Sequence, residues 1–159
     1  MIRMGSSSTI QNVLGELLKV NRERVAGYKK ASQNTDDPGL KAMFLNMADQ
    51  GQKNITDISK AIVDQNGNTR SAKASHAEKI YGALATFKTK FSDKSIKNVL
   101  TSCESMETAA MNIYEKARDK ALDVQLAKLI EKHEMSFRSS QEVIRVYRKA
   151  YLNLDKMYS

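Results

Sequence analysis

Apolar side chains recur every three or four residues in four long stretches of the chain, a spacing that gathers them on one face of an α-helix. The stretches that we expect to be long helices are about 9–33, 37–64, 93–120 and 123–152. Asp37, which precedes Pro38, and Asp123 are suited to cap the second and the fourth, because an Asp side chain accepts hydrogen bonds from the free amides of a first turn. The pattern therefore predicts an all-α protein.

The lengths of the connections predict how these helices are arranged. Only a few residues separate the first long helix from the second and the third from the fourth, so we expect two antiparallel hairpins. The middle connection holds a shorter helical pattern over 76–91 and is long enough to return along a whole bundle. We therefore expect a ferritin-like four-helix bundle of two antiparallel hairpins joined by a long crossover containing a short helix. The expected boundaries are a disordered N-terminal segment at 1–8, the bundle at 9–152 and a C-terminal tail at 153–159.

An internal repeat supports the two-hairpin interpretation. Shifting the first hairpin by 86 positions places Tyr28 on Tyr114 and the cap Asp37 on Asp123. Apolar positions also coincide, and no gap is needed. Coincidence between amphipathic helices is the alternative, but the shared Tyr-x-Lys-Ala sequence and the equal turn lengths favour a pseudo-symmetric bundle.

Composition excludes several classes of protein. One Cys and two His leave no disulfide framework and no Cys-rich zinc site. No apolar run approaches the roughly 18 residues of a membrane span. Residues 1–8 lack the apolar segment of a secretory signal. We therefore expect a cytoplasmic protein that does not enter a membrane.

The formal net charge is +8, which raises the question of nucleic-acid binding. The basic residues are not gathered in one run, and the interleaved exposed aromatics of single-strand binders are missing. We favour a solvated basic surface, with nucleic acid as an alternative partner. The basic residues placed on the outer face of the first helix are Lys19, Arg22, Arg24, Lys29 and Lys30.

The chemistry associated with this fold is a carboxylate-bridged di-metal centre, which needs several Glu and His ligands on four helices. Ferritin-like di-iron proteins such as rubrerythrins place a Glu seven residues before a helical Tyr, and an aromatic-x3-Ala-x2-Glu-x2-His pattern on the next helix. Compared with that pattern, the expected ligand positions are held by Asn21, Gly51, Asn54, Glu107, Phe137 and Ser140. Only Glu107 is a strong ligand among them. We therefore expect no catalytic residues, no cofactor and no classical di-metal site, and we interpret Phe137 as filling the space of the missing cluster.

Glu107 still requires an explanation, because a carboxylate on a buried stripe is costly without partners. His133 is expected to lie about one turn from its level, and Asn21 lies at a comparable depth on the pseudo-symmetric helix. We expect a buried polar network of Glu107, His133 and Asn21 with the hydroxyl of Tyr28 or Tyr114. A remodelled site that binds iron or manganese through Glu107 and His133 is the alternative.

Several stretches resemble a bacterial ferritin-like family known as domain of unknown function 2383. The similar stretches are residues 17–31, the turn at 36–38, residues 80–93, and residues 102–110 together with 114–117. The resemblance extends over about residues 10–150. It implies a ferritin-like fold, a loose link to bacterial stress responses and no established activity, so there are no catalytic residues to transfer.

Together these observations predict a non-enzymatic ferritin-like bundle that acts by binding or assembly and has lost its di-metal site. One alternative is a metal-binding or ferroxidase-type protein that uses Glu107 and His133. Another is a basic stress protein that associates with nucleic acid. A homodimer or another protein partner is expected, and the C-terminal tyrosines could either supply that contact or cover the end of the bundle itself.

Overall fold

The chain forms a bundle of long helices in a computed structural model that describes residues 3–65, 93–120 and 123–158. The helices in these ranges are α1 (Arg3–Gln33), α2 (Pro38–Asp64), α4 (Asp93–Asp119) and α5 (Val124–Tyr158). The described ranges contain no strand. The prediction of an all-α four-helix bundle is therefore confirmed.

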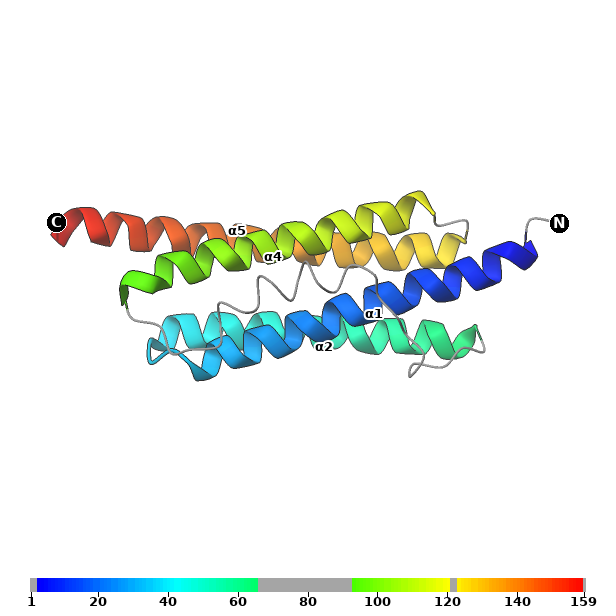
Figure 1. Ribbon diagram of the computed structural model, residues 1–159, viewed down its shortest axis with the longest axis horizontal. Helices are drawn as coiled ribbons and strands as arrows, with labels where there is room; N and C mark the ends of the chain where they lie inside the picture. Colours follow the sequence, from blue (N-terminus) through cyan, green and yellow to red (C-terminus); the bar gives the residue numbers. More distant parts are fainter. Residues whose placement is uncertain (1–2, 66–92, 121–122, 159) are drawn as a thin grey trace.

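The bundle consists of two antiparallel hairpins laid against each other (Figure 1). Helix α1 packs on α2 and α4 packs on α5, while α1–α4 and α2–α5 contacts join the two hairpins. Helices α2 and α4 run in the same direction, so the end of α2 and the start of α4 lie at opposite ends of the bundle. Two parallel middle helices are the arrangement that a single long crossover would join, and the predicted crossover itself lies outside the described residues. The short helix predicted over 76–91 lies outside the described residues.

Both predicted caps are present at the helix starts. The Asp37 Oδ1 atom accepts a hydrogen bond from the Leu40 amide at 3.0 Å, and Asp123 Oδ1 accepts one from the Leu126 amide at 3.1 Å. Tyr151 also donates its hydroxyl hydrogen to Asp37 Oδ2, which ties α5 to the turn between α1 and α2. This C-terminal tyrosine therefore covers the end of its own bundle.

Two boundaries differ from those expected. Helix α1 begins at Arg3, within the segment 1–8 that we expected to be disordered. Helix α5 continues to Tyr158, past the expected tail boundary at 153. Neither flanking segment contains proline, the residue that interrupts a helix most strongly, so the backbone hydrogen-bond pattern can extend beyond the residues with helical periodicity.

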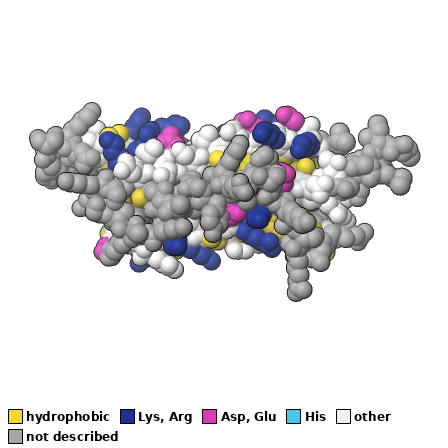
Figure 2. Space-filling model, viewed as in Figure 1, with side chains coloured by type: hydrophobic (Ala, Val, Ile, Leu, Met, Phe, Trp, Pro, Cys, Tyr) yellow, Lys and Arg dark blue, Asp and Glu magenta, His cyan; other side chains and the backbone are white. Residues whose placement is uncertain are grey.

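The core is a continuous stripe of apolar side chains from all four described helices. Equivalent residues of the repeat are both buried in several cases: Tyr28 and Tyr114, Ile10 and Ile96, Leu40 and Leu126, Ile58 and Ile144. No helix in the described ranges is both long and apolar enough to cross a membrane. On the described part of the face in Figure 2, Lys and Arg side chains are scattered among acidic and polar ones.

Helices α1 and α2 approach each other closely at Gly51. A Cβ atom at this position would lie 2.6 Å from Val25 Cγ2, closer than van der Waals contact allows. We predict that Gly51→Ala lowers the free energy of unfolding by about 1–3 kcal/mol through overpacking, although alanine favours a helix by about 1 kcal/mol over glycine. Urea unfolding measures the change.

The exposed neighbour Gln52 supplies the control, because Gln52→Ala should alter stability by no more than about 0.5 kcal/mol. Truncating the opposing side chain with Val25→Ala makes room for the added methyl group. If Gly51→Ala costs as much in the Val25→Ala background as in the wild type, the close approach is not the cause.

Candidate functional site

A buried ion pair between α1 and α4 lies at the centre of the polar residues. The Arg24 Nε and Nη2 atoms donate to Glu107 Oε2 and Oε1, each at 2.7 Å. The two side chains are 1% and 0% exposed. The expectation that Arg24 lies on the outer face of the first helix is therefore wrong: its guanidinium provides the cation that the buried Glu107 carboxylate requires.

All four helices form the surroundings of the guanidinium. Its carbon lies 4.3 Å from the ring centroid of Phe137 on α5, a cation–π contact. On α2, Gly51 lies beside the guanidinium, since a Cβ there would be in ordinary van der Waals contact with Arg24 Nη1 at 3.6 Å. Phe137 is thus buried in the interior, where it contacts the cation.

Asn21 binds the Arg24 guanidinium at its Nη1 atom. Its Oδ1 atom accepts hydrogen bonds from Arg24 Nη1 and Asn54 Nδ2, both at 3.1 Å. Its Nδ2 atom donates to the Leu17 carbonyl and to the Tyr114 hydroxyl, both at 2.8 Å. Both polar atoms of the amide therefore have partners, and the orientation of the amide is determined by them.

A chain of hydrogen bonds leads from Tyr114 towards the surface. The Tyr114 hydroxyl lies 2.8 Å from His133 Nδ1, and His133 Nε2 lies 3.1 Å from Asp57 Oδ2. The Asp57 carboxylate can only accept, which assigns the hydrogen of the neutral imidazole to Nε2 and makes Nδ1 the acceptor of the Tyr114 hydroxyl hydrogen. The hydroxyl oxygen in turn accepts from Asn21. His133 is 1% exposed and Asp57 is 32% exposed, so the chain joins the core to solvent.

Burial and charge set the pKa values along this chain. Burial lowers the pKa of His133, although Asp57 opposes the shift. Burial raises the pKa of Asp57, but the hydrogen bonds from His133 and Lys132 outweigh it and hold that pKa below its usual value. Burial raises the pKa of Tyr114, which therefore keeps its hydroxyl hydrogen at neutral pH.

Tyr28 is placed differently from its counterpart in the repeat. Its hydroxyl is buried and has no hydrogen-bond partner among the described residues. Burial and the nearby Glu107 charge raise its pKa. The structure thus brings Asn21, Glu107, Tyr114 and His133 into one network, in which Arg24 is the link to Glu107, and leaves Tyr28 packed beside it.

The donor set does not suit a metal ion. Both Glu107 oxygens bind Arg24, and both ring nitrogens of His133 have hydrogen-bond partners. Within the described ranges, no three His, Cys, Asp or Glu residues are grouped closely enough to ligate a metal. A cation brought to Glu107 would meet the positive charge of a guanidinium that is already bonded to both carboxylate oxygens.

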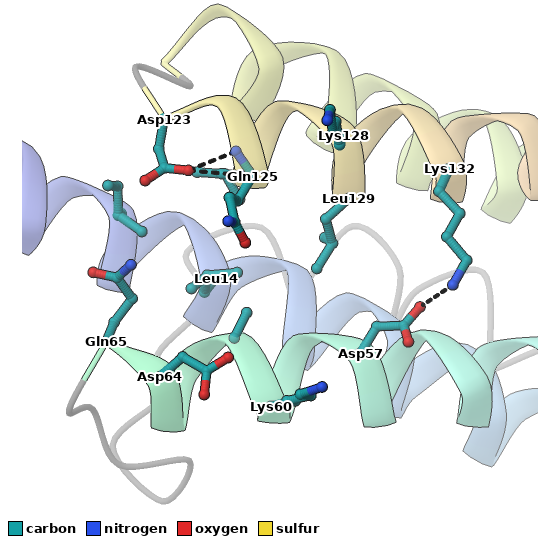
Figure 3. A pocket seen from close by; sticks show the side chains of 13 residues that line it. Leu14, Asp57, Lys60, Asp64, Gln65, Asp123, Gln125, Lys128, Leu129 and Lys132 are labelled. Carbon is teal, nitrogen blue, oxygen red and sulfur yellow. Dashed lines mark hydrogen bonds and ion pairs between the residues drawn. The ribbon is translucent and has the colours of Figure 1, made fainter.

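The outer end of the network opens into a groove between α2 and α5. Asp57 pairs with Lys132 across this groove at 3.1 Å (Figure 3). A hollow of about 350 Å³ lies on one side of the pair, with Leu14 and Leu129 among its apolar walls and Lys60 at its edge. A second hollow, of about 360 Å³, also includes Asp57 and Lys132.

Sequence reasoning did not find Arg24 or Asp57 as members of the site. Arg24 lies three residues after Asn21, and Asp57 lies three residues after Asn54, so both continue a helical face that already held a candidate residue. That spacing was the available signal. It was overlooked because a charged side chain normally faces water.

Removing one partner of the ion pair should be far more costly than removing both. We predict that Glu107→Gln lowers the free energy of unfolding by about 3–5 kcal/mol, because it leaves the Arg24 charge buried without its counter-ion. The double variant Arg24→Met with Glu107→Leu should recover most of that loss. Chemical denaturation of the three proteins measures both effects.

The exposed pair between Glu142 and Arg145 offers a matched control for the same chemical change. Glu142→Gln should cost less than about 1 kcal/mol, since a surface pair contributes little. Equal losses in Glu107→Gln and Glu142→Gln would contradict the assignment of Arg24 as the essential partner of Glu107.

Comparison with known families gives a match over most of the chain. The model of a family described as Domain of unknown function (DUF2383) matches residues 9–120. These residues include α1 after its first turns, α2 and α4, and therefore Asn21, Arg24 and Glu107. No curated protein matches the chain.

Proposed function

Because the chain belongs to the DUF2383 family, whose description assigns no activity, we propose a function from its own residues: it is a ferritin-like bundle that works without a metal centre and acts by binding or assembly. The buried Arg24–Glu107 pair is the observation that supports this proposal.

The Arg24 guanidinium is a positive charge in the bundle interior, where ferritin-like di-metal proteins hold metal ions. In ferritin-like di-metal proteins, Glu and His side chains from four helices surround cations in the bundle interior. Here Arg24 supplies a covalently attached cation to the one remaining carboxylate, and α2, α4 and α5 all contribute to its surroundings. The Arg24 charge neutralises the Glu107 carboxylate, and both carboxylate oxygens already accept hydrogen bonds from Arg24.

The ferritin-like assignment is supported by helix direction. Helices α2 and α4 are parallel while each hairpin is antiparallel, which is the arrangement that a single long crossover produces. A cytoplasmic location and a role in stress responses complete the proposal, and both derive from the sequence pattern and the family resemblance.

The test of the metal-free proposal is metal content and ferroxidase activity. Protein purified without chelator and without an immobilised-metal column should contain far less than one iron, manganese or zinc per chain, before and after incubation with Fe²⁺ or Mn²⁺. Elemental analysis and Fe²⁺ oxidation assays measure these properties. A stoichiometry of about one or two metals per chain, lost in Glu107→Gln or His133→Gln, would instead favour the ferroxidase alternative.

Assembly as a homodimer is the form of interaction that exposed apolar residues on α5 support. Met135 is 62% exposed and Val146 is 55% exposed, and Val143 is also exposed. Their spacing of eight and three residues places them on one side of the helix. Apolar groups gathered on one side of a surface helix are typical of contact sites.

We therefore predict that the wild-type protein has the mass of two chains in light scattering and that Val146→Lys converts it to one chain. Val63→Lys, a change of the same kind at an exposed position on α2, should leave the dimer intact. A wild-type protein that stays monomeric at high micromolar concentration would refute the homodimer and direct attention to other protein partners.

A further inference from the structure

His133 stands between the interior of the bundle and the groove between α2 and α5. On its inner side it contacts Tyr114 from α4, and on its outer side it contacts Asp57 from α2. Other charged groups that influence these side chains are Lys132 beside it on α5, Arg24 on α1 and Glu134, which acts on Tyr114. The imidazole therefore has one partner in a buried environment and one partner at the surface.

In the neutral state every hydrogen along this chain has an acceptor. Asn21 donates to the Tyr114 hydroxyl, the hydroxyl donates to His133 Nδ1, and His133 Nε2 donates to the Asp57 carboxylate. The donors all point outward, from the core to the groove. This order requires an unprotonated Nδ1 atom.

Protonation of His133 makes this order impossible. The added hydrogen on Nδ1 would face a hydroxyl that already accepts from Asn21, and the Tyr114 hydrogen would lose its acceptor in a fully buried position. The outer contact changes in the opposite sense, because a cationic imidazole is attracted to the Asp57 carboxylate more strongly than a neutral one. The inner bond weakens while the outer bond strengthens.

We propose that His133 is a proton-operated switch that binds Tyr114 when neutral and moves towards Asp57 in the α2–α5 groove when protonated. Only a small shift is needed, because His133 Nε2 already lies 3.1 Å from Asp57 Oδ2. In the protonated state a positive charge lies behind the Asp57–Lys132 pair, which borders both hollows of the groove, and the Tyr114 hydroxyl in the core loses its bond to α5. The switch does not depend on the proposed function, because it requires only these hydrogen bonds.

The expected dependence on pH follows from the lowered pKa of His133. The unfolded chain binds a proton near pH 6.5, while the folded chain binds it only at lower pH. Stability from this group is therefore complete above about pH 6.5 and is lost as the pH falls towards the folded pKa, with the unfolding constant rising up to about tenfold per pH unit. Asp57 adds a separate loss at lower pH, because its own folded pKa is lowered from 3.8.

Two variants should move the His133 pKa in opposite directions, which a purely structural role would not do. Tyr114→Phe removes the hydroxyl that donates to His133 Nδ1 and so stabilises the neutral imidazole. The His133 pKa should therefore rise. Asp57→Asn removes the charge that favours the cation while keeping an acceptor for Nε2, so the pKa should fall. NMR titration of the imidazole resonances measures both shifts, and His76→Gln assigns the two histidines of the chain.

The same titration should show the Tyr114 ring resonances changing with the midpoint of His133. In parallel, urea unfolding of the wild type should become easier between pH 6.5 and the folded pKa, and His133→Gln should lack that part of the pH dependence. Asp57 is at the surface, so Asp57→Asn keeps the proposal testable even if Tyr114→Phe does not fold. An ordinary His133 pKa that neither variant moves, or a Tyr114 ring that does not respond to its titration, would overturn the switch.

Discussion

A guanidinium and a carboxylate that are both removed from water have to stabilise each other, and neighbouring helices have to supply whatever polar contacts the pair leaves over. Arg24 and Glu107 impose this requirement on the middle of the bundle. Asn21 accepts a further hydrogen bond from Arg24, Phe137 covers the face of the guanidinium, and Gly51 keeps α2 from colliding with Val25 of α1 at that level. The close approach of α1 and α2 and the polar network therefore lie in the same layer of the bundle.

The two hairpins are equivalent in their apolar stripes but not in this central layer. Under the 86-residue shift Arg24 corresponds to Ala110, Gly51 corresponds to Phe137, and Asn21 corresponds to Glu107. One hairpin supplies the cation, and the other supplies the anion together with the Phe137 ring that covers the cation. A symmetric centre would place like groups opposite each other, whereas this asymmetric one pairs opposite charges. The repeat thus explains the shape of the bundle, while its departures from symmetry explain the chemistry of the interior.

The parts of this structure that the sequence predicts are those that depend on periodicity. Helical spacing predicts the four long helices, and the Asp37 and Asp123 caps predict where two of them begin. The start of α1 and the end of α5 carry no proline, are set by weak local preferences, and differ from the expected boundaries. Arg24 could not be recognised from its type, because a long basic side chain on α1 faces water in most proteins and only the position of Glu107 on another helix shows why this one does not.

The arrangement also determines where any chemistry of the described residues can take place. Burial raises the pKa of Tyr28 and of Cys103, so neither deprotonates readily at neutral pH, and the Glu107 carboxylate is engaged by Arg24. These groups are closed off from a ligand in solution. Asp57 and Lys132 are different, because they face the groove. Asp57 is also hydrogen-bonded to His133, and from there hydrogen bonds continue through Tyr114 to Asn21 and Arg24. A change in the charge or position of Asp57 therefore acts on the same hydrogen bonds that stabilise the core, and a ligand that contacted Asp57 in the groove between α2 and α5 would be linked to the stability of the bundle.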